Sequence, residues 1–317
     1  MYIVTGGAGF IGSNLVRALN DEIGDDVIVV DDLTDGHKFA NIVDLDIADY
    51  FDVDEFPEWL RSDRGLAKKI KTVFHQGACS ATTEWDGRYM LRNNFSYSKF
   101  LLHHCLDHGI PFIYASSAAV YGGASDFAEA PENERPLNVY GYSKLLFDQY
   151  VRRLPAVKHQ QVAGLRYFNV YGPREQHKGA MASVAHHFDR QIREDGEARL
   201  FEGSDGYGDG EQLRDFVAVD DVCRVNLWFL EHHASGIFNV GTGKAQTFND
   251  VANAVIAWHG RGRIRYIPFP EHLVGAYQSY TEANLDNLRG AGCDVTFADV
   301  ESGVKGYLDE IARMSSG

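Results

Sequence analysis

A glycine-rich segment directly after the first β-like run constrains this chain most. The run YIVT begins at Tyr2, and TGGAGFIG then places Gly6, Gly9 and Gly12 three residues apart before an apolar helical pattern. Glycines at such positions permit a tight turn, close approach of the backbone to a pyrophosphate, and close packing of helix on strand. The N-terminus of the following helix supplies positive charge for an anion. The segment predicts a dinucleotide-binding turn, although glycines also occur at ordinary strand-to-helix bends.

Short β-branched or aromatic runs alternate with longer helical stretches over the first 170 residues. The runs are YIVT, VIVV at Val27, TVFH at Thr72, PFIYAS at Pro111 and QVAGLRYFN at Gln161. Such alternation predicts βαβ units with right-handed crossovers, and therefore an α/β fold built on a doubly wound parallel Rossmann sheet.

The pattern changes along the rest of the chain, which predicts a second, smaller unit. After Gly172 the sequence becomes Gly-rich and charged, and order returns at RDFVAVDDV and GIFNVGTG. We expect a dinucleotide-binding domain over residues 1–171 and 214–241. A smaller mixed α/β substrate-binding lobe is expected over 172–213 and 242–317.

The charge balance limits the classes of partner. The 317 residues carry a net charge of −15, which argues against nucleic acid or a membrane, because both require a surface rich in Lys and Arg. A small anionic ligand is compatible, since backbone N–H groups bind it whatever the net charge. The four widely spaced cysteines predict neither a disulfide framework nor a metal site. A first strand that begins at Tyr2, with no apolar run of about 18 residues, predicts a cytoplasmic protein.

Two acidic residues end the second β-like run. Asp31 follows Gly12 by about 20 residues, where a carboxylate can accept a hydrogen bond from the adenosine ribose. Asp31 and Asp32 would repel a 2′-phosphate, whereas Lys38 could pair with one or stand as a solvated loop cation. The residues therefore predict dinucleotide binding and leave NADP and NAD open.

The segment HQGACS ends another predicted strand on the same side of the sheet. Its residues are expected to line the cofactor, and the alternative is a simple turn of small residues. They are Gln76, Gly77, Ala78, Cys79 and Ser80.

A serine, a tyrosine and a lysine form the candidate catalytic group. Tyr140 and Lys144, in YGYSK, would share one face of a helix, and Ser117 closes a predicted strand where open α/β sheets bind ligands. A phenol with a pKa of about 10 is a poor base, and a nearby ammonium favours its phenolate. We expect Lys144 to activate Tyr140 and Ser117 to hydrogen-bond the reacting oxygen. The alternative is a core tyrosine beside a surface lysine.

These motifs, with RYFNVYGPR and RDFVAVDDV, resemble the extended short-chain dehydrogenase/reductase family in order and spacing over most of the chain. ACSATTEWDGRYM, PLNVYGYSK, YFNVYGPREQHKGAMASVAHH and GIFNVGTG are similar to a nucleotide-sugar epimerase branch whose members invert C6 of an ADP-heptose for the lipopolysaccharide inner core. The resemblance implies an isomerase that acts on an ADP-heptose, with one tightly bound NADP (alternatively NAD) per subunit, and a homo-oligomer.

The implied chemistry is hydride transfer. The C–H of a secondary alcohol is not acidic, so inversion by proton abstraction is prohibitive, whereas oxidation to a ketone and return of the hydride to the other face avoids this step. The resemblance assigns the two acid/base groups to Tyr140 and Lys178. Lys178 would need a pKa lowered by burial or by neighbouring cations. An exposed loop lysine is the alternative.

Further contacts are implied position by position. Those to the cofactor are Phe10, Ile11, Asn93, Val170, Lys144 and Lys178. Those to the substrate are Asn169, Ala180, His187, Phe201, Glu202, Gly203, Ser204, Arg214 and Tyr277. The planar guanidinium of Arg214 suits a diphosphate. His187 taken alone is more typical of a core or surface histidine.

Two other interpretations stay open. One is a different nucleotide-sugar enzyme on this scaffold, such as a UDP-hexose 4-epimerase; dehydratases of the family carry Asp-Glu where Ala118 and Ala119 stand. The other is a cofactor-binding regulator without turnover, which would typically lack the tyrosine or the lysine. Asp32 and Val53 depart from residues that the family often places near a 2′-phosphate, and this keeps NAD as an alternative.

Overall fold

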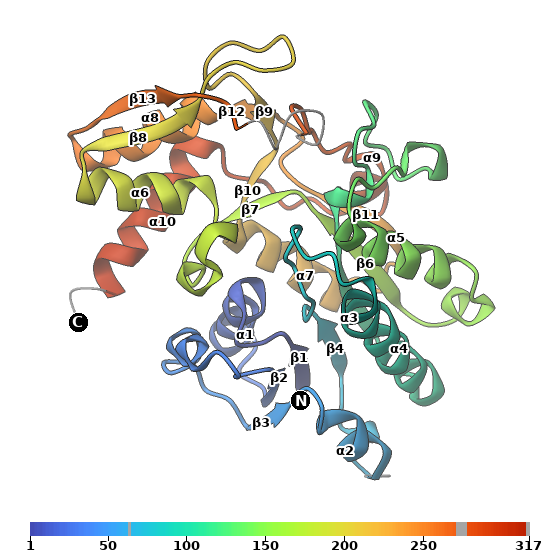
Figure 1. The fold of residues 1–317 in the computed structure, drawn as a ribbon. Coiled ribbons are helices and arrows are strands. Elements are labelled where there is room, and N and C mark those ends of the chain that lie inside the picture. Colours follow the sequence, from blue (N-terminus) through green and yellow to red (C-terminus); the bar gives the residue numbers. More distant parts are fainter. Residues whose placement is uncertain (63–64, 271–277, 315–317) are drawn as a thin grey trace.

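The computed structural model describes residues 1–62, 65–270 and 278–314. In this part of the chain, a sheet of seven parallel strands runs in the order β11-β6-β5-β4-β1-β2-β3 (Figure 1). Its strands are β1 (Tyr2–Thr5), β2 (Val27–Asp31), β3 (Asp49–Asp52), β4 (Thr72–His75), β5 (Phe112–Ser117), β6 (Val162–Tyr167) and β11 (Gly236–Val240). The direction of winding reverses between β1 and β4, and ligands of such sheets bind at the carboxyl ends beside this point.

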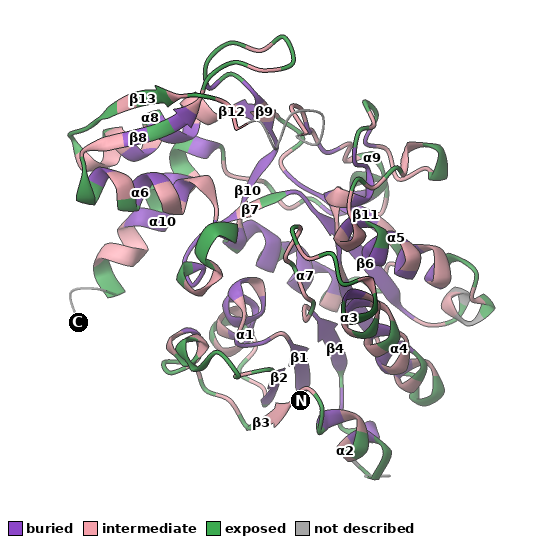
Figure 2. Ribbon diagram, viewed as in Figure 1, coloured by how far each residue is buried: buried purple, intermediate pink, exposed green. Residues whose placement is uncertain are grey.

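Alternation along the strands builds a core on each face of the sheet. Val4 and Val29 face one side, whereas Ile3 and Ile28 face the other, and the strand interiors are buried (Figure 2). The first face is covered by α1 (Phe10–Glu22) and α7 (Val219–Glu231). The second is covered by α2 (Phe56–Ser62), α4 (Tyr97–His108) and α5 (Val139–Arg152). Helices on both faces make the fold a doubly wound α/β sheet, as predicted.

The edge strand β3 was not predicted. Its sequence DYFD places acids at both ends, and no residue of the strand is fully buried. It pairs in parallel with β2 alone. An edge strand needs no continuous apolar run, because one side is open to solvent.

A third hydrophobic cluster forms the lobe beyond the carboxyl ends of the strands (Figure 1). It is built from α6 (Val184–Glu194), α8 (Phe248–His259), α10 (Val300–Met314), β8 (Glu197–Phe201) and β13 (Arg263–Ile267). Two short pairs adjoin it, β7 (Asn169–Tyr171) with β10 (Phe216–Ala218) and β9 (Leu213–Arg214) with β12 (Gln246–Thr247). Leu288 of α9 (Asp286–Gly290) and Cys293 pack instead into the core of the main sheet. The proposed domain boundaries stay a prediction.

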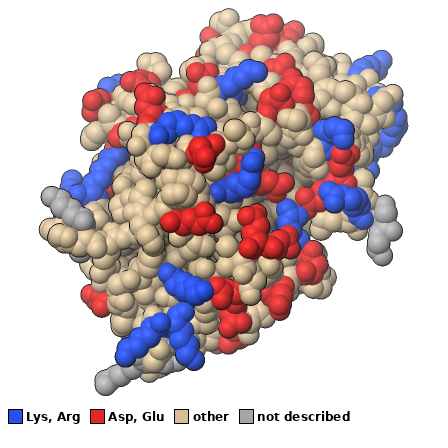
Figure 3. Space-filling model, turned by 180° about the vertical axis from the view of Figure 1, so that it is seen from behind, with Lys and Arg blue, Asp and Glu red and all other residues tan. Residues whose placement is uncertain are grey.

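Charges of both signs are interspersed on the face seen from behind (Figure 3). No broad field of Lys and Arg covers that face. None of the described helices combines the length and apolar character needed to cross a bilayer.

The glycine turn after β1 depends on the absence of side chains. A Cβ at Gly12 would lie 2.0 Å from the carbonyl oxygen of Gly6, a backbone atom that cannot move away alone. We expect Gly12→Ala to lower the free energy of unfolding by roughly 1–3 kcal/mol through overpacking, measured by urea denaturation. Gly36→Ala is the control, because a Cβ there meets nothing within 4 Å. Equal stability of the two variants would contradict the close packing of α1 on the turn.

Candidate active site

The turns that follow β1 and β4 meet at the switch point. Gly6 adopts a left-handed conformation (φ +68°), and a Cβ on it would lie 2.6 Å from the Cα of Gly77. Gly9 is the N-cap of α1 and offers no side-chain hydrogen bond to the first turn. The N–H groups of that turn, beside Phe10 and Ile11, are therefore available to an anion. This cradle of backbone suits the pyrophosphate of a dinucleotide.

The carboxylate of Asp31 accepts hydrogen bonds from groups of the protein itself, rather than being exposed toward a ribose. One oxygen accepts from the backbone N–H of Ala8 at 2.8 Å. The other accepts from the backbone N–H of Asp32 at 2.7 Å and from the amino group of Lys38 at 2.7 Å. Lys38 thus lies at the end of β2 and neutralises Asp31, which reduces the repulsion that a 2′-phosphate would meet there.

A buried histidine connects this turn to α4. Nδ1 of His75 lies 2.6 Å from the hydroxyl oxygen of Thr5, and Nε2 lies 2.7 Å from that of Ser98. Ser98 donates to the carbonyl of Asn94, so Nε2 carries the proton toward Ser98 and Nδ1 accepts from Thr5. Burial and then the charge of Lys144 lower the pKa of His75 to about 3. The imidazole of His75 is therefore neutral, and its hydrogen bonds connect the end of β1 to α4 at the base of the crevice.

Ser117 and Tyr140 are brought together at the carboxyl end of β5. Asn138 caps α5 by accepting from the N–H of Gly141 at 2.8 Å, which places Tyr140 in the first helical turn. Burial raises the pKa of Tyr140, and the adjacent side chain of Ser117 opposes this shift.

Lys144 lies one turn further along α5 and is buried. Its amino group donates to the carbonyl of Ala115 at 2.8 Å. Burial lowers the pKa of Lys144 to about 8, with the charge of Asp148 acting in the opposite direction. Burial shifts the pKa of Tyr140 upward overall, opposite to the lowering that was expected from Lys144.

Asn94 connects the segment after β4 to α5. This side chain accepts from the N–H of Cys79 at 2.8 Å and donates to the carbonyl of Cys79 at 2.9 Å and to the hydroxyl of Ser143 at 3.0 Å. Asn94 lies in a π-helical turn, Arg92–Ser96, between α3 (Gly87–Leu91) and α4. Asn93 in the same turn donates to the carbonyl of Tyr89. Such turns are frequent at functional sites.

The other residues proposed to contact the cofactor differ from one another in exposure and in side-chain direction. Gln76 accepts from the hydroxyl of Tyr167 at 3.1 Å and donates to Asn226 at 3.3 Å, so its side chain turns toward α7. Ala78 and Ser80 are exposed beside Cys79, and Val170 is half-buried on β7.

A buried ion cluster anchors α5 on the sheet. The carboxylate of Asp148 accepts from the hydroxyls of Tyr114 and Ser116, each at 2.9 Å, and from the Nε of Arg166 at 3.0 Å. Arg166 also pairs with Glu134. All three donor residues come from β5 and β6, so the cluster fixes α5 over the strand that carries Ser117.

Lys178 lies in a 3₁₀ turn, Gln176–Met181, that reaches the glycine turn from the lobe. Its amino group lies 5.0 Å from the centroid of the Phe10 ring. Burial lowers the pKa of Lys178, and the charge of Glu175 opposes this. Next to it, Nδ1 of His177 lies 3.0 Å from the side-chain nitrogen of Asn41, which also donates to the carbonyl of Ala8. The turn therefore borders the proposed pyrophosphate position.

The proposed substrate residues lie around the short strand pairs and the lobe. Asn169 begins β7 and is exposed, whereas Arg214 on β9 is buried and lies 5.7 Å from the ring of Phe248. Phe201 ends β8, and the amide of Gln212 donates to the carbonyl of Glu202 at 3.2 Å and to the hydroxyl of Ser204 at 3.1 Å. The others are Ala180 and Gly203, both exposed, and His187, half-buried on α6. Tyr277 lies outside the described residues.

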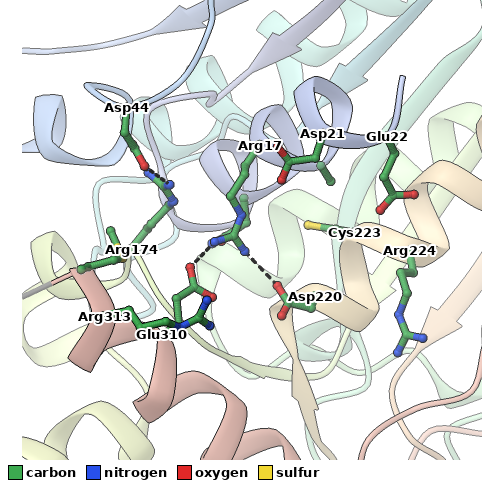
Figure 4. Close-up of a pocket in the computed structure, with 13 residues that line it drawn as sticks. Arg17, Asp21, Glu22, Asp44, Arg174, Asp220, Cys223, Arg224, Glu310 and Arg313 are labelled. Atoms are coloured by element: carbon green, nitrogen blue, oxygen red, sulfur yellow. Dashed lines mark hydrogen bonds and ion pairs between the residues drawn. The ribbon is translucent and has the colours of Figure 1, made fainter. Parts of the chain in front are cut away.

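A cavity of about 440 Å³ lies away from these residues, between α1, α7 and α10 (Figure 4). Arg17 points into it between Asp220 and Glu310 and pairs with both (Figure 4). Arg174 at its rim pairs with Asp44. These charges are mutually satisfied, and neither Ser117 nor Tyr140 lines the cavity, so we place no chemistry there.

Several of the supporting residues escaped the sequence analysis. His75, Asn94 and Asp148 carry no local motif, and their partners are distant in the chain. Arg166 and Glu175 fall within the stretches RYFNVYGPR and YFNVYGPREQHKGAMASVAHH, but those stretches assign them no role.

The neutral state of His75 predicts a pH dependence. A histidine whose pKa is lowered by folding costs stability below its unfolded pKa of about 6.5, because only the unfolded chain then takes up the proton. Between pH 7 and pH 5 we expect the free energy of unfolding of the native chain to fall by about 2 kcal/mol more than that of His75→Asn. Urea denaturation at both pH values measures this difference. The control is His37→Asn at an exposed position; parallel pH profiles for His75→Asn and the native chain would refute a neutral His75.

Comparisons with known proteins agree with this geometry. The profile of the NAD dependent epimerase/dehydratase family matches residues 2–241. The ADP-L-glycero-D-manno-heptose-6-epimerase of Alkalilimnicola ehrlichii is 66% identical over 313 residues, which are 98% of this chain and 98% of that protein. The structure of ADP-L-glycero-D-manno-heptose-6-epimerase from Helicobacter pylori is 33% identical with a TM-score of 0.84, over 98% of this chain and 96% of that one. The structure of Thermus thermophilus UDP-glucose 4-epimerase in complex with NAD is 27% identical with a TM-score of 0.80, over 98% of both chains. The chain therefore belongs to the NAD-dependent epimerase/dehydratase family.

Proposed function

We propose that this chain is an ADP-L-glycero-D-manno-heptose 6-epimerase. It would convert ADP-D-glycero-D-manno-heptose to the L-glycero epimer through a transient 6-keto sugar, for lipopolysaccharide inner-core biosynthesis. The observation that carries the proposal is the neighbouring Ser117–Tyr140 pair at the carboxyl end of β5, beside a glycine turn that Lys178 reaches from the lobe. The 66% identity to an enzyme of that name supports the choice of substrate.

The residues divide the chemistry between two sides of the sugar. Bound NADP supplies the hydride acceptor for oxidation of C6 and the hydride donor for its reduction. Tyr140 takes the proton of the C6 hydroxyl on one face, and Ser117 orients that oxygen by a hydrogen bond. On the opposite face, Lys178 exchanges the proton of the C6 oxygen. Its lowered pKa suits it for this role. The helix N-terminus at Tyr140 favours the phenolate.

The remaining groups hold the ligands. The backbone of the glycine turn would hold the pyrophosphate of the cofactor, and the ammonium group of Lys144 would hold its nicotinamide ribose. Arg214 meets the ADP diphosphate of the substrate from the lobe. The homo-oligomeric state and the cytoplasmic location stay predictions.

The assay that tests this function needs no added redox partner. The purified protein, with its bound nucleotide identified after release, is given ADP-D-glycero-D-manno-heptose, and the configuration at C6 is followed by NMR. UDP-glucose is offered in parallel, because the UDP-glucose 4-epimerase of Thermus thermophilus shares the fold. Turnover of UDP-hexoses alone would favour a 4-epimerase and reject the substrate proposed here.

Removal of the Tyr140 hydroxyl separates chemistry from binding. We expect Tyr140→Phe to fold and retain cofactor but to lose at least about 100-fold in kcat, since a positioned acid/base group contributes on this scale. Tyr142→Phe is the matched control, because Tyr142 lies on the same helix with an exposed side chain. Unchanged turnover of Tyr140→Phe in the epimerase assay would refute the role of the phenol.

We propose NADP as the cofactor because Lys38 places an ammonium at the end of β2 against Asp31. Lys38→Ala should weaken NADP binding about 10-fold or more and leave NAD binding much less affected, since a charged hydrogen bond to the 2′-phosphate is lost. Titration of the apoprotein with both nucleotides measures the ratio. Lys71→Ala, at an exposed ion pair with Asp25, serves as the control. An equal loss for NADP and NAD would count against a 2′-phosphate at this position.

A further inference from the structure

A fully buried carboxylate closes the loop that carries Lys178. Glu175 accepts from the N–H of Gly172 at 3.3 Å, where the loop begins. Its two oxygens also accept from the backbone N–H and from the hydroxyl of Ser183, each at 2.6 Å, where the loop ends. Both ends of the segment therefore bind one side chain, and Lys178 lies between them.

The same carboxylate is held from the lobe. Tyr307 on α10 adjoins Glu175, and burial together with the charge of that carboxylate raises the pKa of the phenol. Nδ1 of His186 on α6 lies 3.3 Å from that hydroxyl. Burial lowers the pKa of His186, while the charge of Glu175 opposes this. Polar groups from three segments thus surround an acceptor that has no exposed surface, as a buried anion requires.

A second contact fixes the approach of the loop to the cofactor side. Arg174 adopts a left-handed conformation (φ +68°) that side chains other than glycine seldom take. Its guanidinium donates to the carbonyl of Asn41 at 2.6 Å and to the two carboxylate oxygens of Asp44 at 2.8 and 2.7 Å. This bidentate pair, together with the Glu175 contacts, holds the loop that presents Lys178.

Burial and the charge of Glu175 both act on the amino group of Lys178. The backbone N–H of Lys178 donates to the carbonyl of Glu175 at 3.0 Å, and its side-chain amino group lies above the Phe10 ring of α1. Burial lowers its pKa, and the negative charge of Glu175 raises it. His177, its neighbour, has a pKa lowered by burial and by the charges of Lys38 and Lys178.

We propose that Glu175 is the positioning residue for Lys178, closing the loop that presents this lysine to the substrate and supplying its buried counter-charge. The inference rests on the proposed role of Lys178 in epimerisation. It predicts that the protonation of Lys178 depends on a residue that contacts neither cofactor nor sugar.

The test measures Lys178 directly. The pH dependence of acetylation of its amino group is followed by mass spectrometry in the native chain, Glu175→Gln and Glu175→Asp. In Glu175→Gln the midpoint should fall by about one pH unit, because the counter-charge is lost, and kcat should fall about 10-fold or more. Glu175→Asp, with the charge retained on a shorter side chain, should keep the midpoint near the native value and still lose turnover, because it cannot reach both ends of the loop.

Controls separate this inference from the proposed function. Glu194→Gln, at an exposed position of α6, should change neither the midpoint nor kcat. Identical acetylation midpoints in Glu175→Gln and the native chain would overturn the counter-charge, whatever the turnover. Lys178→Met tests the proposed function instead: if it retained native kcat, Lys178 would have no role in epimerisation, while the acetylation result for Glu175 would still stand.

A variant that keeps the charge covers the case in which Glu175→Gln does not fold. Tyr307→Phe removes the phenol hydroxyl beside the carboxylate and leaves the charge of the carboxylate in place. We expect kcat to fall several-fold with KM for the nucleotide sugar nearly unchanged, since the loop is loosened rather than the binding surface altered. Native kcat in Tyr307→Phe would then reject the loop-closing role.

Discussion

The structure depends on the contact of two backbone turns at the point where the sheet reverses its winding. A Cβ on Gly6 would lie 2.6 Å from the Cα of Gly77, and one on Gly77 would lie 3.1 Å from the backbone nitrogen of Gly6, so the first position excludes a side chain and the second leaves little room for one. This contact sets α1 against the end of β1 and directs its uncapped first turn into the crevice. Lys38, which pairs with Asp31 at the end of β2, and Lys178, whose amino group lies above Phe10, both lie beside that helix end.

Buried polar groups then fix the catalytic helix and strand relative to this turn. Asp148 receives donors from β5 and β6, and a buried pair of this kind is costly to break because the remaining charge stays desolvated. The path from Gly77 through Thr5, His75 and Ser98 to Asn94 reaches the same helix from the other side. These contacts specify geometry more than they add stability, since each must first offset the loss of hydration of its groups.

The fold and the residues proposed for the centre of the site could be recognised from local sequence patterns, whereas the buried residues that support them could not. The glycine turn, the strand β5 and the Tyr140–Lys144 spacing are visible in short stretches of sequence, because each depends on residues close along the chain. Glu175 and Asp148 look like ordinary acids until folding brings donors from remote segments around them. The direction of the Tyr140 pKa shift was not predicted either, because burial is a property of the whole fold and here exceeds the opposing effect of Ser117.

The pairing of Arg174 with Asp44 connects the loop that carries Lys178 with the segment that follows β2. The segment after β2 contains Lys38 and continues to Asn41 and Asp44, which hold the lysine-bearing loop through Arg174. Under the roles proposed for Lys38 and Lys178, redesign of this segment to change nucleotide preference would also shift the loop that carries the proposed acid/base lysine. The Arg174–Asp44 pair would then couple cofactor choice to sugar chemistry through a mechanical link.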